Sequence, residues 1–302
     1  MKFYVSKTGN KLNGLPYCPE HIAECICVNP LYPVKFVDDH VFHFNNKVII
    51  DSGAFQDVKD SQRLSFMEAL QRQFDFQKNC NISADAIVSY DRLVDEQIHE
   101  GKQFKKRVSE EVGKRYVEET IQAAEFLSEY IKKHSINKDL ILSCQGTTLE
   151  QYQYCIERVS NMARKRDIIG LGGFCIISRS KEYEEQFYKV IEWAFPYLHS
   201  KGLTKVHIFG VGIFKILIRA EILAIKYGIN LSYDTSSAEI SGVMGRVFDP
   251  SSLTMTHIFE KYEKNIEYKP RNLAYINIKS INDFWENFDD MCGIVPYKIE
   301  GW

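Results

Sequence analysis

Residues 205–237 have the sequence KVHIFGVGIFKILIRAEILAIKYGINLSYDTSS, in which two short apolar runs flank a longer amphipathic segment. The runs at 205–212 and 229–237 contain β-branched residues and predict strands, whereas the segment at 214–227 predicts a helix. A strand, a helix and a strand in this order predict two parallel strands joined by a right-handed crossover. This unit indicates an α/β fold.

The same alternation continues toward the N-terminus. Six more candidate strands lie at 2–6, 24–29, 47–53, 85–91, 139–146 and 167–173. Helical patterns lie at 64–80, 103–134, 149–164 and 182–199. Eight strands alternating with helices predict a TIM-type (β/α)8 barrel. An open, doubly wound sheet is the alternative, because the segments after the first two strands, Lys7–Ala23 and Pro30–Asn46, have no helical pattern.

Composition and length fit one globular protein with a large core. The 302 residues are 45% hydrophobic and 26% charged, and the net charge of -2 does not itself indicate nucleic-acid binding. We predict a catalytic barrel domain at 1–242 and a small C-terminal segment at 243–302 that packs on the barrel. The N-terminus has no apolar signal core, and no apolar run reaches the roughly 18 residues of a membrane span. These features predict a cytoplasmic protein with no membrane partner, and its eight cysteines are expected to be reduced.

Polar residues and glycines gather at the C-terminal edge of the apolar runs. They are Asp51, Asp91, Gln145, Gly172, Gly173, Gly210, Gly212 and Asp234. In an α/β barrel this edge is where the loops after the strands converge and form the active site. A single Asp there often caps the next helix or starts a turn, but the shared position of the whole set favours one site.

The residues around Asp51 and Asp91 suit a flat ligand. Ser52 and the glycine after it allow a tight turn that brings a ligand close to the backbone. Phe55 and Tyr90 are candidates for stacking on that ligand, with a place in the core as the alternative.

Four further positions could contact the polar groups of a ligand. Gln145 offers both a donor and an acceptor, which suits the edge of a base or an amide. Gly172 and Gly173 are expected to leave backbone N–H and C=O groups open to the ligand. Gly212 lies in a Gly-Val-Gly segment that could approach phosphate, although no complete phosphate-binding motif is present.

Two carboxylates that face each other across a site favour chemistry at a glycosidic bond. One carboxylate attacks the anomeric carbon, and the other transfers a proton to the leaving group or from the incoming group. Asp51, Asp91 and Asp234 are the carboxylates at this edge from which such a pair could come.

Six short motifs, taken in order, resemble one family. They are DSGAFQ (51–56), SYDRLVDE (89–96), CQGTTLEQY (144–152), GLGGF (170–174), HIFGVG (207–212) and SYDTSSAE (232–239). Together they resemble the segments DSGGFQ, FDE, QGG, IGGL and LMGVG and the nucleophile region of the tRNA-guanine transglycosylases and their DNA-modifying relatives. Ala54 stands where the family has a glycine.

The resemblance implies a TIM barrel and a set of roles. Asp234 would be the nucleophile that forms a covalent glycosyl-enzyme, and Asp51 the general acid/base. Asp91, Gln145 and the backbone of Gly172 and Gly173 would read the base. In the reaction of the family, guanine leaves C1′ of the sugar and a 7-deazapurine takes its place. Free guanine and a 7-deazaguanine such as preQ0 would therefore be partners, and no cofactor is expected.

Departures from the family pattern bear on whether the substrate is DNA or tRNA. The tRNA enzymes carry a structural zinc site after the nucleophile, whereas only His257 and Cys292 follow Asp234 here as soft ligands. Two such ligands cannot close a tetrahedral site, so we expect no zinc subdomain. This loss, with the shorter chain, favours DNA over tRNA. The alternatives are tRNA, a non-catalytic nucleic-acid-binding subunit, and a hydrolase that lets water resolve the intermediate. A homodimer is left open.

Basic residues after the strands could contact phosphates of a flipped-out target nucleotide. The candidates are Arg92, Arg179, Lys181, Lys215 and Arg246. A solvated surface charge is the alternative for each of them.

Three other sequence patterns do not indicate a functional site. Cys25 and Cys27 are two residues apart on a predicted strand, so both side chains should point into the core. His40 and His43 fit no standard metal-ligand spacing, and no metal site is predicted. Arg164-Lys165-Arg166 precedes a strand and should lie at the opposite end of the barrel from the site.

Overall fold

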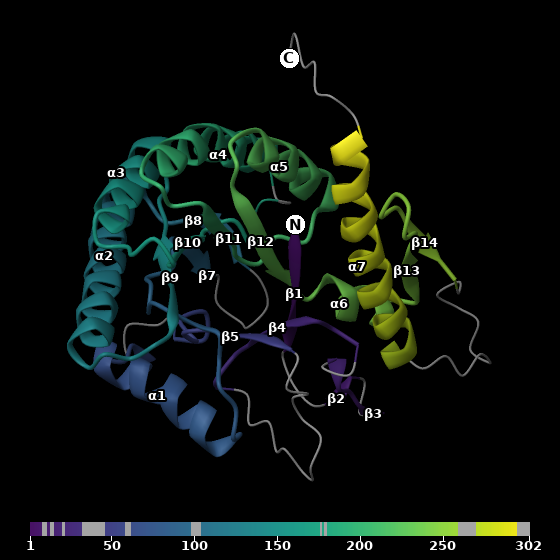
Figure 1. Cartoon of the computed structure of the whole chain (residues 1–302), viewed down its shortest axis with the longest axis horizontal. Helices are drawn as coiled ribbons and strands as arrows, with labels where there is room; N and C mark the ends of the chain where they lie inside the picture. Colours follow the sequence, from purple (N-terminus) through teal and green to yellow (C-terminus); the bar gives the residue numbers. More distant parts are fainter. Residues whose placement is uncertain are drawn as a thin grey trace.

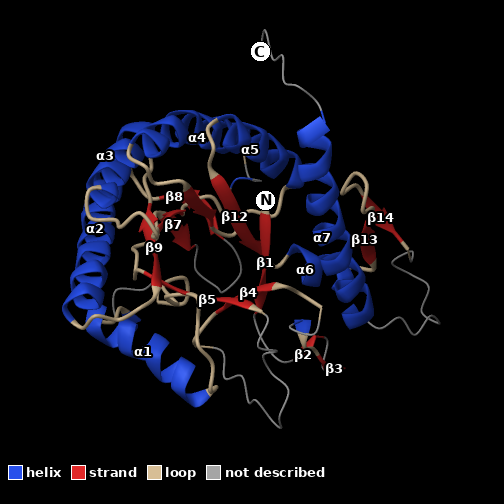
Figure 2. Cartoon of the chain, in the orientation of Figure 1, coloured by secondary structure: helices blue, strands red, loops and turns tan. Residues whose placement is uncertain are grey.

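Eight strands of the chain close into one parallel barrel (Figure 1, Figure 2). The computed structural model describes residues 1–7, 11–12, 15–19, 22–31, 46–57, 62–97, 104–175, 177, 180–258 and 270–294. The barrel strands are β1 (Lys2–Lys7), β4 (Cys25–Val28), β5 (Lys47–Ile50), β6 (Ala86–Val88), β9 (Asp139–Cys144), β10 (Ile168–Leu171), β11 (Lys205–Ile208) and β12 (Asn230–Thr235). Each coincides with one of the apolar runs in the sequence.

The strand order is β1-β12-β11-β10-β9-β6-β5-β4, and the barrel closes at β1. This strand pairs in parallel with β12, where Tyr4 lies opposite Asp234, and with β4, where Ser6 lies opposite Cys27. The predicted TIM-type barrel is therefore confirmed, and the open sheet is excluded.

Five helices form an arc around the strands (Figure 1). They are α1 (Phe66–Asn79), α2 (Glu110–Lys133), α3 (Leu149–Ser160), α4 (Lys181–Ser200) and α5 (Phe214–Lys226). The first four begin at a Ser or Thr whose side chain accepts a backbone N–H of the first turn, which satisfies a donor that the helix leaves open. Their apolar faces pack on the outside of the barrel and form the main core.

The helix predicted at 103–134 begins later than expected. The structure places β8 (Phe104–Arg107) before it, paired antiparallel with β7 (Asp95–Gln97). The helix starts only at the Ser109 cap, because the preceding residues are already engaged in this hairpin. A second small hairpin, β2 (Lys11–Leu12) with β3 (Leu15–Pro16), lies in the segment that showed no helical pattern.

The C-terminal segment packs against the barrel through α7 (Pro270–Ile294). The Trp285 indole N–H donates to the Tyr233 hydroxyl of β12 at 2.8 Å, and both side chains are buried. In the chain, two shorter elements lie between β12 and α7: α6 (Ser237–Val243) and a hairpin of β13 (Arg246–Phe248) with β14 (Met255–His257). The fully buried Asn277 of α7 donates to the carbonyls of Ala238 and Arg246 at 3.2 and 3.0 Å. Within the described residues, no helix combines the length and apolar character needed to cross a bilayer.

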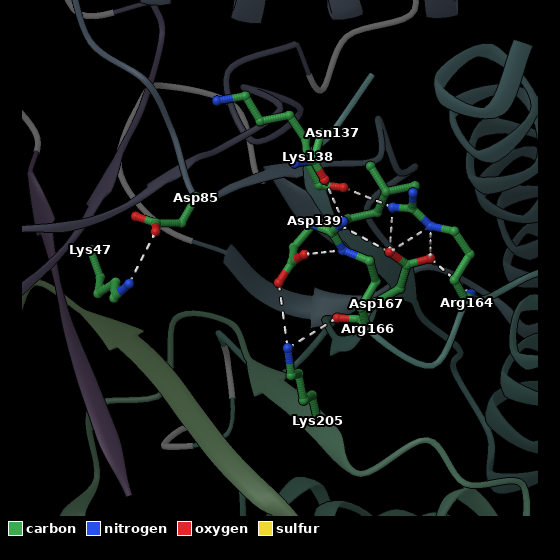
Figure 3. A network of polar contacts seen from close by, with 10 residues as sticks. Lys47, Asp85, Asn137, Lys138, Asp139, Arg164, Arg166, Asp167 and Lys205 are labelled. Atoms are coloured by element: carbon green, nitrogen blue, oxygen red, sulfur yellow. Dashed lines mark hydrogen bonds and ion pairs between the residues drawn. The ribbon is translucent and has the colours of Figure 1, made fainter. Parts of the chain in front are cut away.

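The barrel interior is layered, and charged side chains lie at its bottom, the end at which the strands begin. Lys47, Asp139 and Lys205 are the first residues of their strands. Figure 3 shows the ion pairs of Lys47 with Asp85 and of Asp139 with both Arg166 and Lys205. An apolar layer above them contains Tyr4, Cys25, Cys27, Ile49, Val88 and Ile141. Arg164 and Arg166 belong to the bottom network, as their position before β10 predicted. The apolar layer separates this network from the other end of the barrel.

Removing Asp167 should destabilise the bottom of the barrel. This buried carboxylate accepts the Arg164 side chain at 2.7 Å, the Arg164 N–H at 2.8 Å and the Leu140 N–H at 3.3 Å. Because Asp167→Ala leaves the buried Leu140 N–H and the Arg164 donors without this acceptor, we expect the free energy of unfolding to fall by about 2–3 kcal/mol in urea titrations.

The matched control is Lys181→Ala, which removes an exposed pair with Glu185 at 3.7 Å. Such a pair contributes at most about 1 kcal/mol, so this variant should stay close to the unaltered protein. Equal unfolding midpoints for the two variants would show that the Asp167 network does not stabilise the fold.

Candidate active site

Asp234 lies near the C-terminal end of β12 and extends into the barrel. Because side chains alternate along a strand, the neighbouring Tyr233 points outward, where its ring stacks on Phe3 with centroids 5.4 Å apart. On the inner side, the Ser6 hydroxyl donates to Asp234 Oδ2 at 2.6 Å. The Gly210 N–H donates to Oδ1 at 3.1 Å, and His207 Nε2 lies 3.2 Å from the same oxygen. Asp234 is thus held from β1, from β11 and from the loop that follows β11.

His207 is the buried partner of Asp234. It lies on β11 and is 0% exposed. Its Nδ1 atom lies 2.9 Å from Ser232 Oγ, so both ring nitrogens have polar partners. The ring is flanked by Tyr4 and Phe209, with centroids 5.7 and 4.8 Å away, both in edge-on geometry. These rings restrict the orientation of the imidazole.

Asp51 follows β5 and faces the same interior. Its N–H donates to the Val28 carbonyl at 2.9 Å, and its carboxylate accepts the Ser52 N–H at 2.8 Å. Burial is the main cause that raises the pKa of Asp51 to about 6, and the negative charge of Asp234 raises it further. The two carboxylates are therefore close enough to interact. Among the described residues, no Lys or Arg forms an ion pair with either one.

The turn after Asp51 depends on Gly53 and Arg72. Gly53 has a φ of +77°, and a Cβ there would lie 2.6 Å from the Arg72 guanidinium. Arg72 donates to the Ser52 carbonyl and forms an ion pair with Asp57 at 2.9 Å. The predicted tight turn is present, and Arg72 holds it from α1.

Asp91 and Gln145 form a buried pair. The Gln145 amide donates to Asp91 Oδ2, and Gln145 Oε1 accepts the Val94 N–H at 3.1 Å. Burial raises the pKa of Asp91 to about 7, the charge of Asp51 adds to this, and Arg63 opposes it. Gln145 thus has protein partners on both ends of its amide. In this arrangement it positions Asp91, whereas the sequence suggested that its amide faces the ligand.

The backbone of Gly172 and Gly173 is more occupied than expected. The Gly172 N–H donates to the Cys144 carbonyl at 3.0 Å, and the Gly172 carbonyl accepts the Tyr152 hydroxyl at 2.7 Å. The Gly173 carbonyl accepts Arg107 at 2.7 Å. The expectation of open backbone groups is corrected for these three. Gly173 is needed for its backbone conformation and for close packing, since its φ is +77° and a Cβ there would lie 2.7 Å from the Tyr152 hydroxyl oxygen.

The remaining residues predicted to contact a ligand differ in their exposure to solvent. Phe55 is 42% exposed, so its ring is accessible to a ligand. Tyr90 is 3% exposed, its hydroxyl donates to Asp57 at 2.8 Å, and Arg63 lies 4.0 Å from its ring centroid. The stacking role suggested for Tyr90 is corrected, because its ring is buried under Arg63. Ser52 is also buried, and a Cβ at Gly212 would overlap Ser237 Oγ, which gives Gly212 a packing role.

The basic residues predicted to contact phosphate also differ in their burial and in their partners. Arg92 is buried with its guanidinium 4.5 Å from the Tyr116 ring centroid, which corrects its suggested phosphate role. Lys181 and Lys215 are exposed and pair with Glu185 and Glu184 at 3.7 and 3.3 Å. The Arg246 guanidinium lies 3.8 Å from Met255 Sδ. Arg179 lies outside the described residues.

The structure provides no metal centre within the described residues. Cys25 and Cys27 lie in the apolar layer of the barrel, as their spacing predicted. The seven described cysteines are all free thiols. His40 and His43 lie outside the described residues, and His257 is on the exposed strand β14.

Ser6 and His207 are the functional candidates that the sequence did not single out. Both lie at inward-facing positions of barrel strands, and His207 is a polar residue inside an apolar run. A buried polar side chain needs a partner, so its presence there was a usable signal. Which residues would be partners could not be predicted from the sequence, because contacting residues can lie far apart in the chain: Ser6 and Asp234 are 228 residues apart.

Comparisons with known proteins bear on the fold alone. No family model matches the chain, and no curated protein matches it. One similar solved structure is the HpcH/HpaI aldolase from Desulfitobacterium hafniense DCB-2, with 12% identity and a TM-score of 0.35 over 77% of this chain and 86% of that chain. This distant similarity carries no argument about activity.

Proposed function

We propose that this protein is a base-exchange transglycosylase, a pentosyltransferase that replaces guanine in DNA with a 7-deazaguanine such as preQ0. The observation that carries the proposal is the pair of carboxylates at the barrel mouth. Asp234 is held by Ser6, Gly210 and His207, whereas Asp51 has a pKa of about 6 and lies within electrostatic range of it. Two acids in different environments suit a nucleophile and a proton carrier.

The first half-reaction removes guanine. An Asp234 oxygen forms a bond to C1′ of the sugar while the bond from C1′ to N9 breaks, and the electron pair of that bond goes to the base. Asp51 in its acid form gives a proton to the departing guanine. The products are a glycosyl ester on Asp234, an Asp51 carboxylate and free neutral guanine.

The second half-reaction installs the new base. The incoming 7-deazaguanine gives its N9 proton to the Asp51 carboxylate, and its nitrogen bonds to C1′ as the Asp234 ester breaks. The electron pair of the ester bond returns to Asp234. A group with a pKa near the working pH can serve as acid in one step and base in the next, and the value of about 6 for Asp51 fits both.

Asp91 is the group proposed to read the base. Its carboxylate would accept the N1–H and exocyclic N–H of guanine, which adenine does not offer in the same arrangement. Gln145 donates to Asp91 Oδ2 and so orients the carboxylate for this contact. Phe55, an exposed aromatic residue four positions after Asp51, is the ring proposed to cover the base.

DNA is the proposed polymer because the chain lacks the zinc ligands of the tRNA enzymes that its motifs resemble. Only His257 and Cys292 follow Asp234 as soft ligands. A duplex target would need its guanosine unstacked and flipped, and a single strand would bind without that cost.

The decisive experiment measures base exchange directly. Radiolabelled guanine or preQ0 is incubated with the protein and with single-stranded DNA, duplex DNA or tRNA, and label retained on the polymer is counted. We expect incorporation into DNA that exceeds incorporation into tRNA. Robust labelling of tRNA with none of DNA would reject DNA as the substrate. Abasic sites without incorporation would identify a hydrolase. Absence of label and of abasic sites on all polymers would support a non-catalytic binding subunit.

Guanine binding should depend on pH through Asp91. The raised pKa of about 7 means that Asp91 is mostly protonated at pH 6 and mostly ionised at pH 8. Only the carboxylate accepts two N–H groups, so the Kd for guanine should fall about tenfold between pH 6 and pH 8. Isothermal titration calorimetry across this range tests it.

Asp91→Asn provides the control, because it keeps the shape and cannot ionise. Its guanine affinity should be weak and nearly constant between pH 6 and pH 8. If the variant retained the pH dependence of the unaltered protein, the dependence would belong to another group, and Asp51 would be the first candidate.

A further inference from the structure

The two oxygens of Asp234 have different hydrogen-bond partners. Oδ1 receives the Gly210 N–H at 3.1 Å and faces His207 Nε2 at 3.2 Å. Among the described residues, Oδ2 receives the Ser6 hydroxyl alone, at 2.6 Å. The Gly210 N–H is part of the backbone and His207 is enclosed by rings, so both donors on Oδ1 are fixed. The Ser6 hydroxyl can rotate away. Oδ2 is therefore the oxygen that can be freed for attack.

His207 is oriented to donate to Oδ1. An ionised carboxylate can only accept, so the hydrogen of this contact belongs to His207 Nε2. The other nitrogen, Nδ1, lies 2.9 Å from the Ser232 hydroxyl oxygen, and that hydroxyl donates to the Val206 carbonyl at 3.2 Å. The proton position is assigned from this network. Ser232 lies opposite His207 in the pairing of β11 with β12, so the strand register fixes the contact.

We propose that His207 is a positioning residue that controls the lifetime of the Asp234 glycosyl ester. This inference rests on the proposed base exchange. In the ester, Oδ2 is bonded to C1′ and Oδ1 is the carbonyl oxygen, which still accepts from Gly210 and His207. When the ester breaks, the electron pair of the bond from C1′ to Oδ2 returns to the carboxylate, and the negative charge spreads to Oδ1. A fixed donor at Oδ1 stabilises that developing charge.

The two half-reactions should respond differently to loss of this donor. Forming the ester removes charge from the carboxylate, so losing a donor at Oδ1 does not hinder this step. Breaking the ester restores the charge, so this step slows. A residue with a purely structural role would impair both steps or weaken base binding, and the contrast separates the two roles.

The test uses two buried amides of similar polarity. Gln in His207→Gln can place its amide nitrogen near the position of Nε2 and keep the donor to Oδ1. Asn in His207→Asn is shorter and reaches only toward Ser232. Single-turnover experiments with single-stranded DNA measure ester formation as a protein–DNA adduct on denaturing gels. Addition of preQ0 then measures its breakdown, and calorimetry gives the Kd for guanine.

We expect breakdown to slow by about 10²-fold in His207→Asn, while formation changes by less than about threefold and the adduct accumulates. His207→Gln should recover breakdown to within about fivefold of the unaltered protein, and both variants should bind guanine normally. Equal breakdown rates in His207→Asn and the unaltered protein would overturn the inference. Equal slowing of formation and breakdown would also overturn it, in favour of a structural role.

Ser232→Ala keeps the test decisive if His207→Asn does not fold. It leaves His207 in place and removes the hydroxyl that orients it, so breakdown should slow by a smaller factor, about fivefold, with formation unchanged. A normal breakdown rate in a folded Ser232→Ala would contradict the inference. If the unaltered protein forms no adduct with DNA or tRNA, the proposed base exchange itself fails. An adduct whose breakdown is indifferent to His207 refutes only this inference.

Discussion

Asp234→Asn should abolish base exchange, with a loss of about 10⁴-fold or more and no covalent adduct on denaturing gels. The physical reason is that the amide has no negative charge to stabilise the positive charge that develops at C1′, and its oxygen is a poor nucleophile. Because the side chain keeps its shape, Gly210 and His207 can still donate to Oδ1. The variant should therefore stay folded and bind guanine.

Two comparisons make the Asp234 result specific. Asp234→Ala removes the oxygens completely and should be equally inactive, which guards against slow hydrolysis of the introduced amide back to Asp. Asp249→Asn, an exposed Asp that bonds the Ser251 hydroxyl and N–H, should exchange bases at the normal rate. Adduct formation in a folded Asp234→Ala would assign the nucleophile to another residue.

Asp51→Asn should lower exchange on ordinary guanine by about 10²–10⁴-fold, because the leaving base then departs without a proton. DNA that carries N7-methylguanine separates this effect from misfolding. The methylated base is already positively charged and leaves as a neutral molecule, so it needs no acid. With this substrate Asp51→Asn should form the Asp234 adduct at a near-normal rate.

The second half-reaction should remain slow in that variant, because Asn cannot accept the N9 proton of the incoming base. The adduct should therefore accumulate. In the unaltered protein, formation of the adduct from ordinary guanine should slow as pH rises above about 6, since the acid form of Asp51 is lost with its raised pKa. This decrease of the rate with rising pH should be absent in Asp51→Asn. A loss of the same size on both DNA substrates would argue that Asp51 shapes the site without transferring a proton.

Local patterns were sufficient to predict the elements of the fold. The barrel strands contain β-branched residues, and helices of regular apolar spacing follow the strands from β5 onward, so these signals are contained in short windows. The prediction was inaccurate where a window held two structures, as at Phe104–Arg107, whose hairpin with β7 depends on a partner strand. The small β2–β3 hairpin was not predicted because each of its strands has only two residues, which is too short for a recognisable pattern.

The candidate site could be located from the sequence, but its internal contacts could not. Asp51 and Asp234 end apolar runs, and parallel strands that close into a barrel must bring such ends to one rim. Which side chains are available to a ligand there depends on neighbours distant in the chain. Gln145 is engaged by Asp91 and Val94, and Tyr90 is covered by Arg63.

The order of strands and helices, the barrel they build and the rim that carries the acids follow from residues close together in the chain, because strand and helix periodicities are local properties. The contacts between Ser6, His207 and Asp234 arise only when strands from opposite ends of the chain pair side by side. Closure of the barrel sets their distances and their burial. These two quantities determine which carboxylate is held by fixed donors and which one has its pKa raised toward neutrality.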